Sequence, residues 1–293
     1  MSRWIAADWG TTALRLTLVE DRRALDRRES RDGMGNLARE AFEPALLALA
    51  HGWVDGPMRV VASGMVGARQ GWQEAPYREA PCTPLGGPIV RVATEDSRLD
   101  VRIVPGVSQR RPHPDVMRGE ETQIAGILST IKDFDGVACL PGTHTKWVHL
   151  SASEIVSFRT AVTGELRAAL SSHTVLRHSL DLAGWVESAF LNALDDTLSR
   201  PEALVARLFE LRAADLLLGQ DPAVAASRLS GLLIGAELAA TKPWWMGREV
   251  VLTGAAATTR AYDIALRAQG ITPRILPADE MTLAGLAAAM EAA

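Results

Sequence analysis

The sequence predicts an α/β protein, because two similar turns each lie between strand-like segments and helical patterns follow them. Apolar residues at 4–9 and 13–18 flank a first turn with the sequence Gly-Thr-Thr. A second Gly-Thr turn divides the apolar run 137–150, and a third apolar strand from residue 250 ends in Gly and Ala. Short apolar runs bounded by Gly or Pro are typical of strands. The length of 293 residues suits two domains.

Composition and charge exclude several classes of function. The chain is 47% hydrophobic and 23% charged, with a net charge of −4, so we expect no basic surface for nucleic acid. No basic segment followed by a long apolar run opens the sequence, and no uncharged apolar stretch has the length of a membrane span. We therefore expect a cytoplasmic protein without membrane contact. Cys82 and Cys139 are too few for a disulfide framework.

The first lobe is predicted to contain a hairpin, a helix and a further strand. The hairpin spans about residues 3–20, and apolar residues at helical spacing indicate a helix over 36–49. A strand at 58–62 leads into a loop at 63–72. Four prolines and two glycines between 76 and 88 predict an irregular segment on the substrate side.

The second half of the chain is predicted to be mainly helical around the second hairpin. A helix at 119–130 begins with acidic residues, which suit the positive end of a helix, and residues 166–238 follow a nearly continuous helical pattern. Gly126 and Gly285 lie within the first of these helices and within the last helix, at 282–290. We expect these glycines to let the two helices cross closely. The alternative is that each is a tolerated defect costing about 1 kcal/mol.

The first turn has the chemistry of a nucleotide-phosphate site. A glycine lets the backbone N–H groups of Gly10, Thr11 and Thr12 approach phosphate oxygens, and Asp8 can hold Mg²⁺ directly or through water. The alternative is an ordinary hairpin in which Asp-x-Gly only turns the chain.

The second and third turns are predicted to bind the same nucleotide. Gly142, Thr143 and Thr145 would hold its phosphates, with Lys146 either contacting phosphate or remaining a solvated charge. We expect His144 to pack or to donate a hydrogen bond to phosphate. In the third turn, the small residues that we expect to admit a flat adenine against the backbone are Gly254 and Ala255.

Two Gly-Thr turns about half a chain apart, followed by a Gly-rich turn, resemble the actin, Hsp70 and sugar-kinase superfamily. More specifically, the runs 62–72, 116–123, 140–148 and 163–166 look like those of the 2-dehydro-3-deoxygalactonokinase family, also called 2-keto-3-deoxygalactonate kinases. This resemblance implies two actin-like ATPase (ribonuclease H-like) lobes with ATP in the cleft between them. It implies a first lobe at 1–118, a second at 119–278, and a C-terminal helix at 279–293 that returns to the hinge or first lobe.

The resemblance also implies roles for the acids around residue 120. The Arg-Gly-Glu-Glu turn resembles the Gly-Asp that begins the equivalent helix in carbohydrate kinases, which makes Glu120 the general base. Glu121 and Asp115 are the reserve candidates. The alternative for Glu120 is a helix-start acid that only interacts with the helix dipole, worth a few tenths of a kcal/mol to about 1 kcal/mol.

A keto-deoxy sugar acid is anionic, so its pocket needs a partner for the carboxylate. Arginine is suited to bidentate pairing with a carboxylate, and Arg69 and Arg118 lie within the matching runs. Ser63 and Gln70 would donate hydrogen bonds to hydroxyls, and Trp72 would form an apolar wall. Either arginine could instead be a surface charge, and Arg118 could also stabilise phosphate or pair with a Glu.

The resemblance implies ATP-dependent, Mg²⁺-assisted phosphorylation of 2-dehydro-3-deoxy-D-galactonate at O6 in galactonate catabolism. The sequence leaves the oligomeric state open, with a homodimer as the candidate. The alternatives are a kinase of another sugar acid such as 2-keto-3-deoxygluconate, a non-kinase actin-like ATPase, or a sugar-binding regulator. A regulator would bring a helix-turn-helix or a basic surface, and no segment has that pattern. Neither a Walker Gly-x-x-x-x-Gly-Lys-Ser/Thr nor a Gly-x-Gly-x-x-Gly turn is present.

Overall fold

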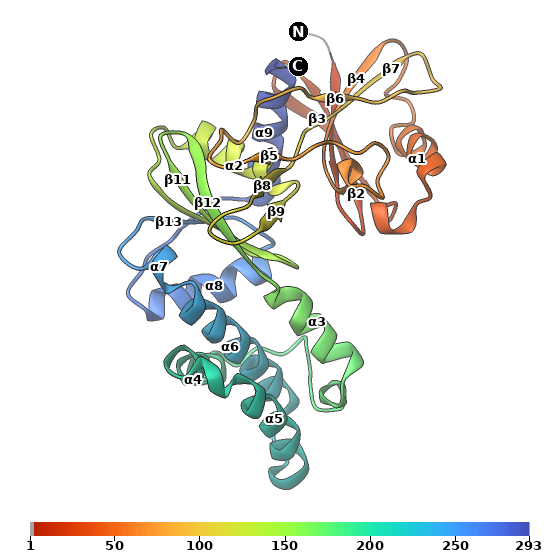
Figure 1. Cartoon of the computed structure of the whole chain (residues 1–293). Coiled ribbons are helices and arrows are strands. Elements are labelled where there is room, and N and C mark those ends of the chain that lie inside the picture. The colour runs from red at the N-terminus through yellow and green to blue at the C-terminus, as the bar shows by residue number, and fades with distance from the viewer. Residues whose placement is uncertain (1–2, 293) are drawn as a thin grey trace. The chain divides into compact units, whose positions relative to one another are not determined.

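A computed structural model describes residues 3–292, and the chain divides into two compact units that combine a sheet with helices (Figure 1). Unit 1 contains both ends of the chain and three of its segments, 1–135, 150–158 and 276–293. Unit 2 contains the two remaining segments, 136–149 and 159–275.

The main sheet of unit 1 has six strands in the order β3-β2-β1-β4-β7-β6. The predicted hairpin forms its β1 and β2, and β1 also pairs in parallel with β4. Alternate side chains of β1 face opposite sides, so that Ile5, Ala7 and Trp9 join one core cluster while Trp4 and Ala6 join another. The strands are β1 (Trp4–Trp9), β2 (Leu14–Glu20), β3 (Arg23–Ser30), β4 (Met58–Gly64), β6 (Val90–Arg91) and β7 (Leu99–Ile103).

Helices cover both sides of this sheet. Helix α1 (Phe42–Leu49) inserts Phe42 and Leu46 into the cluster that contains Trp9, and α9 (Ala278–Ala292) packs Leu286 and Ala289 against the other side. Helix α2 (Glu120–Thr130) packs on α9. A small second sheet contains β5 (Arg78–Glu79), β8 (Val107–Gln109) and β9 (Asp115–Met117), and short 3-10 helices lie at Met34–Asn36, Arg39–Ala41 and Met65–Gly67.

The crossing of α2 and α9 depends on two glycines. A Cβ at Gly126 would lie 2.0 Å from the Met281 carbonyl oxygen, and a Cβ at Gly285 would lie 1.8 Å from that of Thr122. Any larger side chain at either position would therefore clash with backbone atoms. The predicted close crossing at Gly126 and Gly285 is confirmed.

Unit 2 contains most of a five-stranded sheet in the order β12-β11-β10-β13-β14, while the end of β11 and the first part of β12 fall in the segment 150–158 of unit 1. Its strands are β10 (Gly136–Leu140), β11 (Thr145–Ser151), β12 (Glu154–Ala161), β13 (Val250–Leu252) and β14 (Arg274–Ile275). Because β10 and β13 are parallel neighbours, the turns that follow them lie at the same edge of the sheet. The helix after β13 is α8 (Ala256–Ala268), which packs Tyr262 and Leu266 onto the sheet.

The long helical region of unit 2 contains α3 (Thr163–His173), α4 (Glu187–Ser199), α5 (Leu204–Leu218), α6 (Pro222–Ala240) and α7 (Lys242–Trp245), with 3-10 turns at Val175–His178 and Pro201–Ala203. Within this unit, α4, α5 and α6 lie alongside one another (Figure 1). Helix α6 has the length and apolar composition of a membrane span, which the sequence analysis did not anticipate. Two-thirds of that stretch is buried inside the unit, as in a core helix.

Two predicted boundaries were wrong. The helix predicted over 36–49 begins at Phe42, because residues 37–38 are extended and lead into a 3-10 turn. The boundary predicted after residue 118 lies after Asp135, because α2 packs on α9 and stays in unit 1. The C-terminal helix belongs to unit 1 as well, although it begins at Ala278.

Replacing Gly126 by Ala should destabilise the protein by about 1–3 kcal/mol or more, because overpacking outweighs the gain of about 1 kcal/mol in helix propensity. Urea unfolding measures the difference. Gly56→Ala is the matched control, since a Cβ there would meet no atom within 4 Å. Equal stabilities of the two variants would show that the helices do not need this glycine.

Candidate active site

The first predicted phosphate turn is held in place by contacts with a second glycine-containing loop, residues 33–35. Met34 N–H donates to the Gly10 carbonyl oxygen at 3.0 Å, and Gly35 N–H donates to that of Thr11 at 2.8 Å. A Cβ at Gly33 would lie 2.3 Å from the Thr12 carbonyl carbon. The side chains of Thr11 and Thr12 are exposed, so this turn is both fixed in place and open to a ligand.

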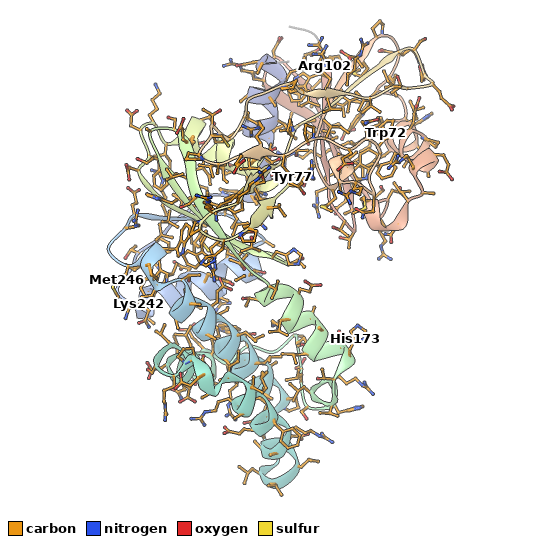
Figure 2. The ribbon with its side chains drawn as sticks, viewed as in Figure 1. Trp72, Tyr77, Arg102, His173, Lys242 and Met246 are labelled. Atoms are coloured by element: carbon orange, nitrogen blue, oxygen red, sulfur yellow. The ribbon has the colours of Figure 1, made fainter. Side chains whose placement is uncertain are left out.

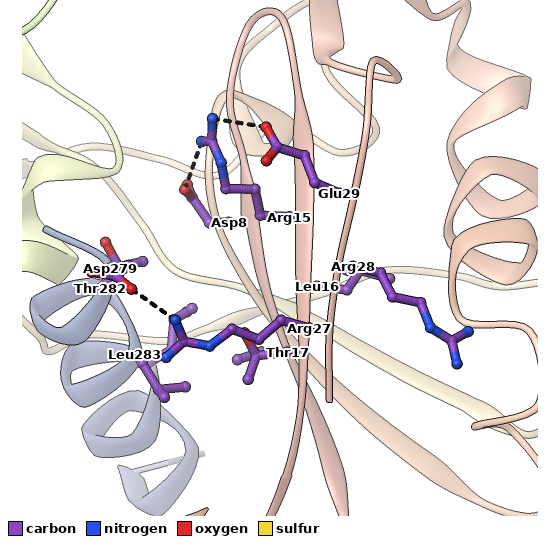
Figure 3. Close-up of a pocket in the computed structure, with 12 residues that line it drawn as sticks. Asp8, Arg15, Leu16, Thr17, Arg27, Arg28, Glu29, Asp279, Thr282 and Leu283 are labelled. Carbon is purple, nitrogen blue, oxygen red and sulfur yellow. Dashed lines mark hydrogen bonds and ion pairs between the residues drawn. The ribbon is translucent and has the colours of Figure 1, made fainter. Parts of the chain in front are cut away.

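Asp8 lies near the end of β1 and forms an ion pair with Arg15. Its carboxylate is one-third exposed and lies 3.4 Å from the guanidinium of Arg15, which also pairs with Glu29 at 3.1 Å (Figure 3). Burial raises the pKa of the Asp8 carboxyl above its ordinary value, although Arg15 opposes that shift. Arg15 was not predicted; its position opposite Asp8 on the paired strand, in register, is the signal that could have found it.

A cavity of about 360 Å³ lies beside Asp8, between the sheet and α9. Arg15 and Arg27 line it, and Arg27 pairs with Asp279 of α9 at 2.7 Å (Figure 3). Both arginines are thus engaged with carboxylates of unit 1.

The ends of β1 and β4 meet the start of α2. Asp8 is the register partner of Ser63, whose hydroxyl is buried and finds no hydrogen-bond partner among the described residues. Gly64 has a φ of 92°, and a Cβ at Gly119 would lie 3.3 Å from its Cα. Asp8, Ser63 and the turn before α2 are therefore brought together within unit 1.

The two glutamates at the start of α2 have different environments. Glu121 is fully buried and accepts the Gly119 N–H at 2.8 and 2.9 Å, which stabilises a turn in which Gly119 has a φ of 105°. Burial and the neighbouring Glu120 raise the pKa of Glu121 to about 8. Glu120 is half-buried and accepts the Arg118 N–H at 3.0 Å. Of this pair, Glu120 is the carboxylate that a substrate can reach.

Asp115, the other reserve candidate, lies on β9 rather than at the start of α2. Its carboxylate accepts the N–H of Val116 at 2.8 Å.

Arg118 extends beneath the loop that follows β4. It donates to the Ala75 carbonyl oxygen at 2.8 Å and lies 4.3 Å over the ring of Tyr77, which Figure 2 labels. A Cβ at Gly67 would lie 2.9 Å from its Nη1. Within the described part of the chain, its buried Nε and Nη1 have no acceptor, and such donors are costly to leave unpaired.

The other predicted substrate contacts are less well placed. The side chain of Arg69 is 83% exposed and lies 3.8 Å from Glu74, and Gln70 is exposed. Trp72, labelled in Figure 2, is buried, and its ring centroid lies 6.0 Å from that of Trp9. Its ring therefore belongs to the hydrophobic core next to the loop at 63–72. This corrects the prediction that Trp72 forms an apolar wall of the substrate pocket.

In unit 2, the start of α3 packs against the backbone of the second predicted turn on one side and leaves the rest of the turn open. Gly142, Thr143 and His144 are exposed. A Cβ at Gly164 would lie 2.1 Å from the Gly142 carbonyl oxygen, and Glu165 N–H donates to that of Thr143 at 2.8 Å. His144 also contacts the Glu165 carboxylate at 2.7 Å. The run at 163–166 thus positions the turn.

The next two residues of this turn are buried. The hydroxyl of Thr145 lies 2.9 Å from that of Tyr262, and the Lys146 ammonium donates to the Thr160 hydroxyl at 2.8 Å. Lys146 is only 5% exposed, so the alternative of a solvated charge was wrong. The open part of the turn is therefore limited to residues 142–144.

The third turn lies beside the second. A Cβ at Gly254 would lie 2.5 Å from the Pro141 carbonyl oxygen, and Ala255 immediately precedes α8. The buried hydroxyl of Thr253 has no partner among residues 3–292. A cavity of about 330 Å³ in unit 2 is lined by one residue of the second turn, by the first residues of α3 and α8, and by polar side chains: Gly142, Thr163, Gly164, Arg167, Ala257, Thr258, Arg260 and Tyr262.

A buried carboxylate of α6 lies under this cavity. Glu237 accepts hydrogen bonds from Trp147 and Tyr262, each at 2.7 Å, and from the hydroxyl of Thr163. Burial raises its pKa although these donors lower it. Glu237 thereby connects β11, α3 and α8 beneath the second turn. Sequence reasoning missed it; a single carboxylate in an otherwise apolar part of a helix was the available signal.

The profile of the 2-keto-3-deoxy-galactonokinase family matches residues 8–289. The chain belongs to this family. A Rhizobium meliloti protein named probable 2-dehydro-3-deoxygalactonokinase is 38% identical over 99% of this chain and 97% of its own length. The 2-dehydro-3-deoxygalactonokinase of Escherichia coli is 34% identical over 97% of this chain and 96% of its own length. The family predicted from the sequence is confirmed.

Solved structures agree with the predicted fold class. A crystal structure from Sinorhizobium meliloti, assigned as a 2-dehydro-3-deoxygalactonokinase, has a TM-score of 0.91, is 37% identical, and matches over 99% of this chain and 96% of its own. The activator of 2-hydroxyisocaproyl-CoA dehydratase from Clostridium difficile has a TM-score of 0.52 at 10% identity over 99% of this chain and 97% of its own, which shows the fold alone. The actin-like α/β fold is confirmed.

Glu121 should make the folded protein less stable as the pH rises. Its pKa increases from 4.5 to about 8 on folding, so its contribution to stability is full below about pH 4.5 and is lost as the pH rises through 8. The loss is at most about 1.4 kcal/mol per pH unit. In urea unfolding between pH 5 and 8, Glu121→Gln should remove this part of the pH dependence.

Glu40→Gln is the control for this measurement, because Glu40 is an exposed carboxylate of unit 1. If Glu121→Gln and Glu40→Gln show the same pH dependence as the unmodified protein, Glu121 does not titrate as its burial implies.

Proposed function

We propose that this chain transfers the terminal phosphoryl group of ATP to O6 of 2-dehydro-3-deoxy-D-galactonate. The observation that carries the proposal is the cavity of unit 2, where a glycine turn and the first residues of two helices meet. Family membership and the names of both curated relatives support the same reaction.

The cavity of unit 2 suits the nucleotide. Its lining includes Gly142, Gly164 near the start of α3, and Thr258 in the first turn of α8. The backbone N–H groups and the dipole at a helix N-terminus favour phosphate groups. We assign the phosphates of ATP to the turn at 142–144 and its adenosine to the turn formed by Gly254 and Ala255.

Asp8 is the proposed partner of Mg²⁺. Magnesium bound with a nucleotide commonly uses one or two carboxylates and keeps several waters, so a single accessible carboxylate fits. The described residues contain no cluster of three His, Cys, Asp or Glu that would form an all-protein metal site. When bound, the ion would neutralise charge on the phosphates. Gly10, Thr11 and Thr12 offer backbone N–H groups to the transferred phosphoryl group.

Glu120 is the proposed general base. It is half-buried at the start of α2, whereas the neighbouring Glu121 is fully buried and is occupied by Gly119. In phosphoryl transfer the base orients the attacking hydroxyl and accepts its proton, so reach matters more than an unusual pKa.

Arg118 is the proposed partner of the substrate carboxylate. Its Nε and Nη1 have no acceptor among the described residues, and a carboxylate would satisfy such donors. Ser63, whose hydroxyl also finds no partner among residues 3–292, is a proposed contact to a sugar hydroxyl. The exposed Arg69 and Gln70 are assigned a smaller contribution.

Replacing Glu120 by Gln should lower turnover by about 10²- to 10⁴-fold and leave the affinity for ATP nearly unchanged. Turnover is measured in a coupled assay for ADP, and ATP affinity by calorimetry. Glu40→Gln is the matched control and should turn over normally. Near-normal turnover of Glu120→Gln would transfer the role to another carboxylate, with Asp115 as the next to test.

The substrate assignment is tested with ATP and a panel of sugars. The 2-keto-3-deoxy acids should be phosphorylated, with the galactonate form preferred over the gluconate form, and galactose should be a poor substrate. Arg118→Met should raise KM for the acid by roughly ten- to a hundredfold, because a charged hydrogen bond is worth about 1.5–3 kcal/mol.

Arg69→Ala is the matched control and should have a smaller effect on KM, because its side chain is 83% exposed. Equal efficiency on galactose and on the acid would contradict the substrate assignment. A larger effect at Arg69 than at Arg118 would move the carboxylate contact to the surface loop.

A further inference from the structure

Helix α5 (Leu204–Leu218) has two apolar faces, and only one of them is packed. Leu204, Leu208 and Leu211 contact a core cluster with residues of α4 and α6. On the other side, Val205 is 80% exposed and Phe209 is 65% exposed. A surface helix of a globular protein ordinarily has one apolar stripe and a polar face opposite to it. The second face of α5 therefore needs an explanation beyond the fold of one chain.

The exposed side chains form one continuous surface, here called the outer face of α5. A helix turns by about 100° per residue, which aligns Val205, Phe209 and Leu216 within a narrow stripe. Two alanines and a leucine lie beside that stripe and widen the surface; they are Ala206, Ala213 and Leu217. Leu216 is 64% exposed and Leu217 is 81% exposed.

The outer face is comparable in size to the largest apolar patches that isolated chains expose, and patches of that size are often functional. Its four large side chains, each about two-thirds exposed or more, amount to several hundred Å² of apolar surface. Two copies of the face buried against each other would remove on the order of 1,000 Å² from water. That area reaches the lower limit for a specific interface between two proteins.

Residues of the outer face before and after Leu211 are arranged so that two copies of α5 could pack about a two-fold axis near that residue. In an antiparallel pair centred there, Val205 and Ala206 would lie at the level of Leu216 and Leu217 of the second copy. The largest side chain, Phe209, would lie opposite the small Ala213. In a two-fold interface each contact is made twice by the same pair of residues. The outer face is thus complementary to itself, with large residues opposite small or aliphatic ones.

We propose that the outer face of α5 is a homodimer interface, occupied by α5 of a second copy of this chain. The charges beside the face favour this over a membrane surface. Arg207 pairs with Glu210 at 3.0 Å and Arg212 with Asp215 at 2.7 Å, so the charges that flank the outer face are balanced. A membrane-binding helix instead has an excess of Lys and Arg on its polar side. The proposal is independent of the reaction catalysed.

Sedimentation equilibrium of the full chain tests the proposal. The unmodified protein should have twice the chain mass of 31.5 kDa at micromolar concentration. Phe209→Glu and, separately, Leu216→Glu should weaken dimerisation by on the order of a hundredfold, because each would bury two unpaired carboxylates per dimer. Both variants should keep kinase activity and the unmodified circular dichroism spectrum.

Leu218→Glu is the matched control. Leu218 is 81% exposed like Leu217, but it lies 100° further around the helix, outside the outer face. This variant should remain dimeric. A monomeric unmodified protein, with or without binding to anionic vesicles, would overturn the proposal. So would a dimer that survives both Phe209→Glu and Leu216→Glu, or one that Leu218→Glu disrupts equally.

Discussion

The close crossing of α2 and α9 is the constraint on which the geometry of unit 1 depends. At Gly126 and Gly285 the backbone of each helix occupies the space that a side chain of the other would need. The crossing therefore fixes the axis of α2 against the C-terminal helix, and with it the position of Glu120 at the start of α2. Gly64 and Gly119 make a second close approach, between the end of β4 and this start. Polar groups from three segments of the chain meet there because these positions carry no side chain.

Burial gives the two adjacent glutamates separate roles. Glu121, without exposure, holds the N–H of Gly119 and has a raised pKa, so it supports the turn. Glu120 stays within reach of a ligand. The same division appears in unit 2, where the buried Glu237 connects Trp147, Thr163 and Tyr262 beneath the exposed turn at 142–144. In each unit a buried carboxylate supports a segment that is proposed to contact the substrate or the nucleotide.

The sequence predicted what local chemistry determines. Glycine turns between apolar strands indicated both hairpins, and glycines inside two helices indicated the crossing, because only a backbone contact requires them. The sequence could not predict which side chains are buried by segments that are distant along the chain. Lys146 and Trp72 have polar or exposed neighbours in the sequence, yet β11 is covered on both faces and Trp72 packs on Trp9. Nor could spacing reveal the contacts of Arg118 with Ala75 and Tyr77, which lie some forty residues earlier in the chain.

The central claim is that these groups transfer one phosphoryl group to the terminal hydroxyl of a keto-deoxy sugar acid. Phosphorus NMR of the product formed from ATP and 2-dehydro-3-deoxy-D-galactonate tests it most directly. We expect one phosphate ester per ADP released, with its phosphorus coupled to the two protons on C6. A phosphate at another carbon, or ADP released as inorganic phosphate accumulates without any ester, would contradict it.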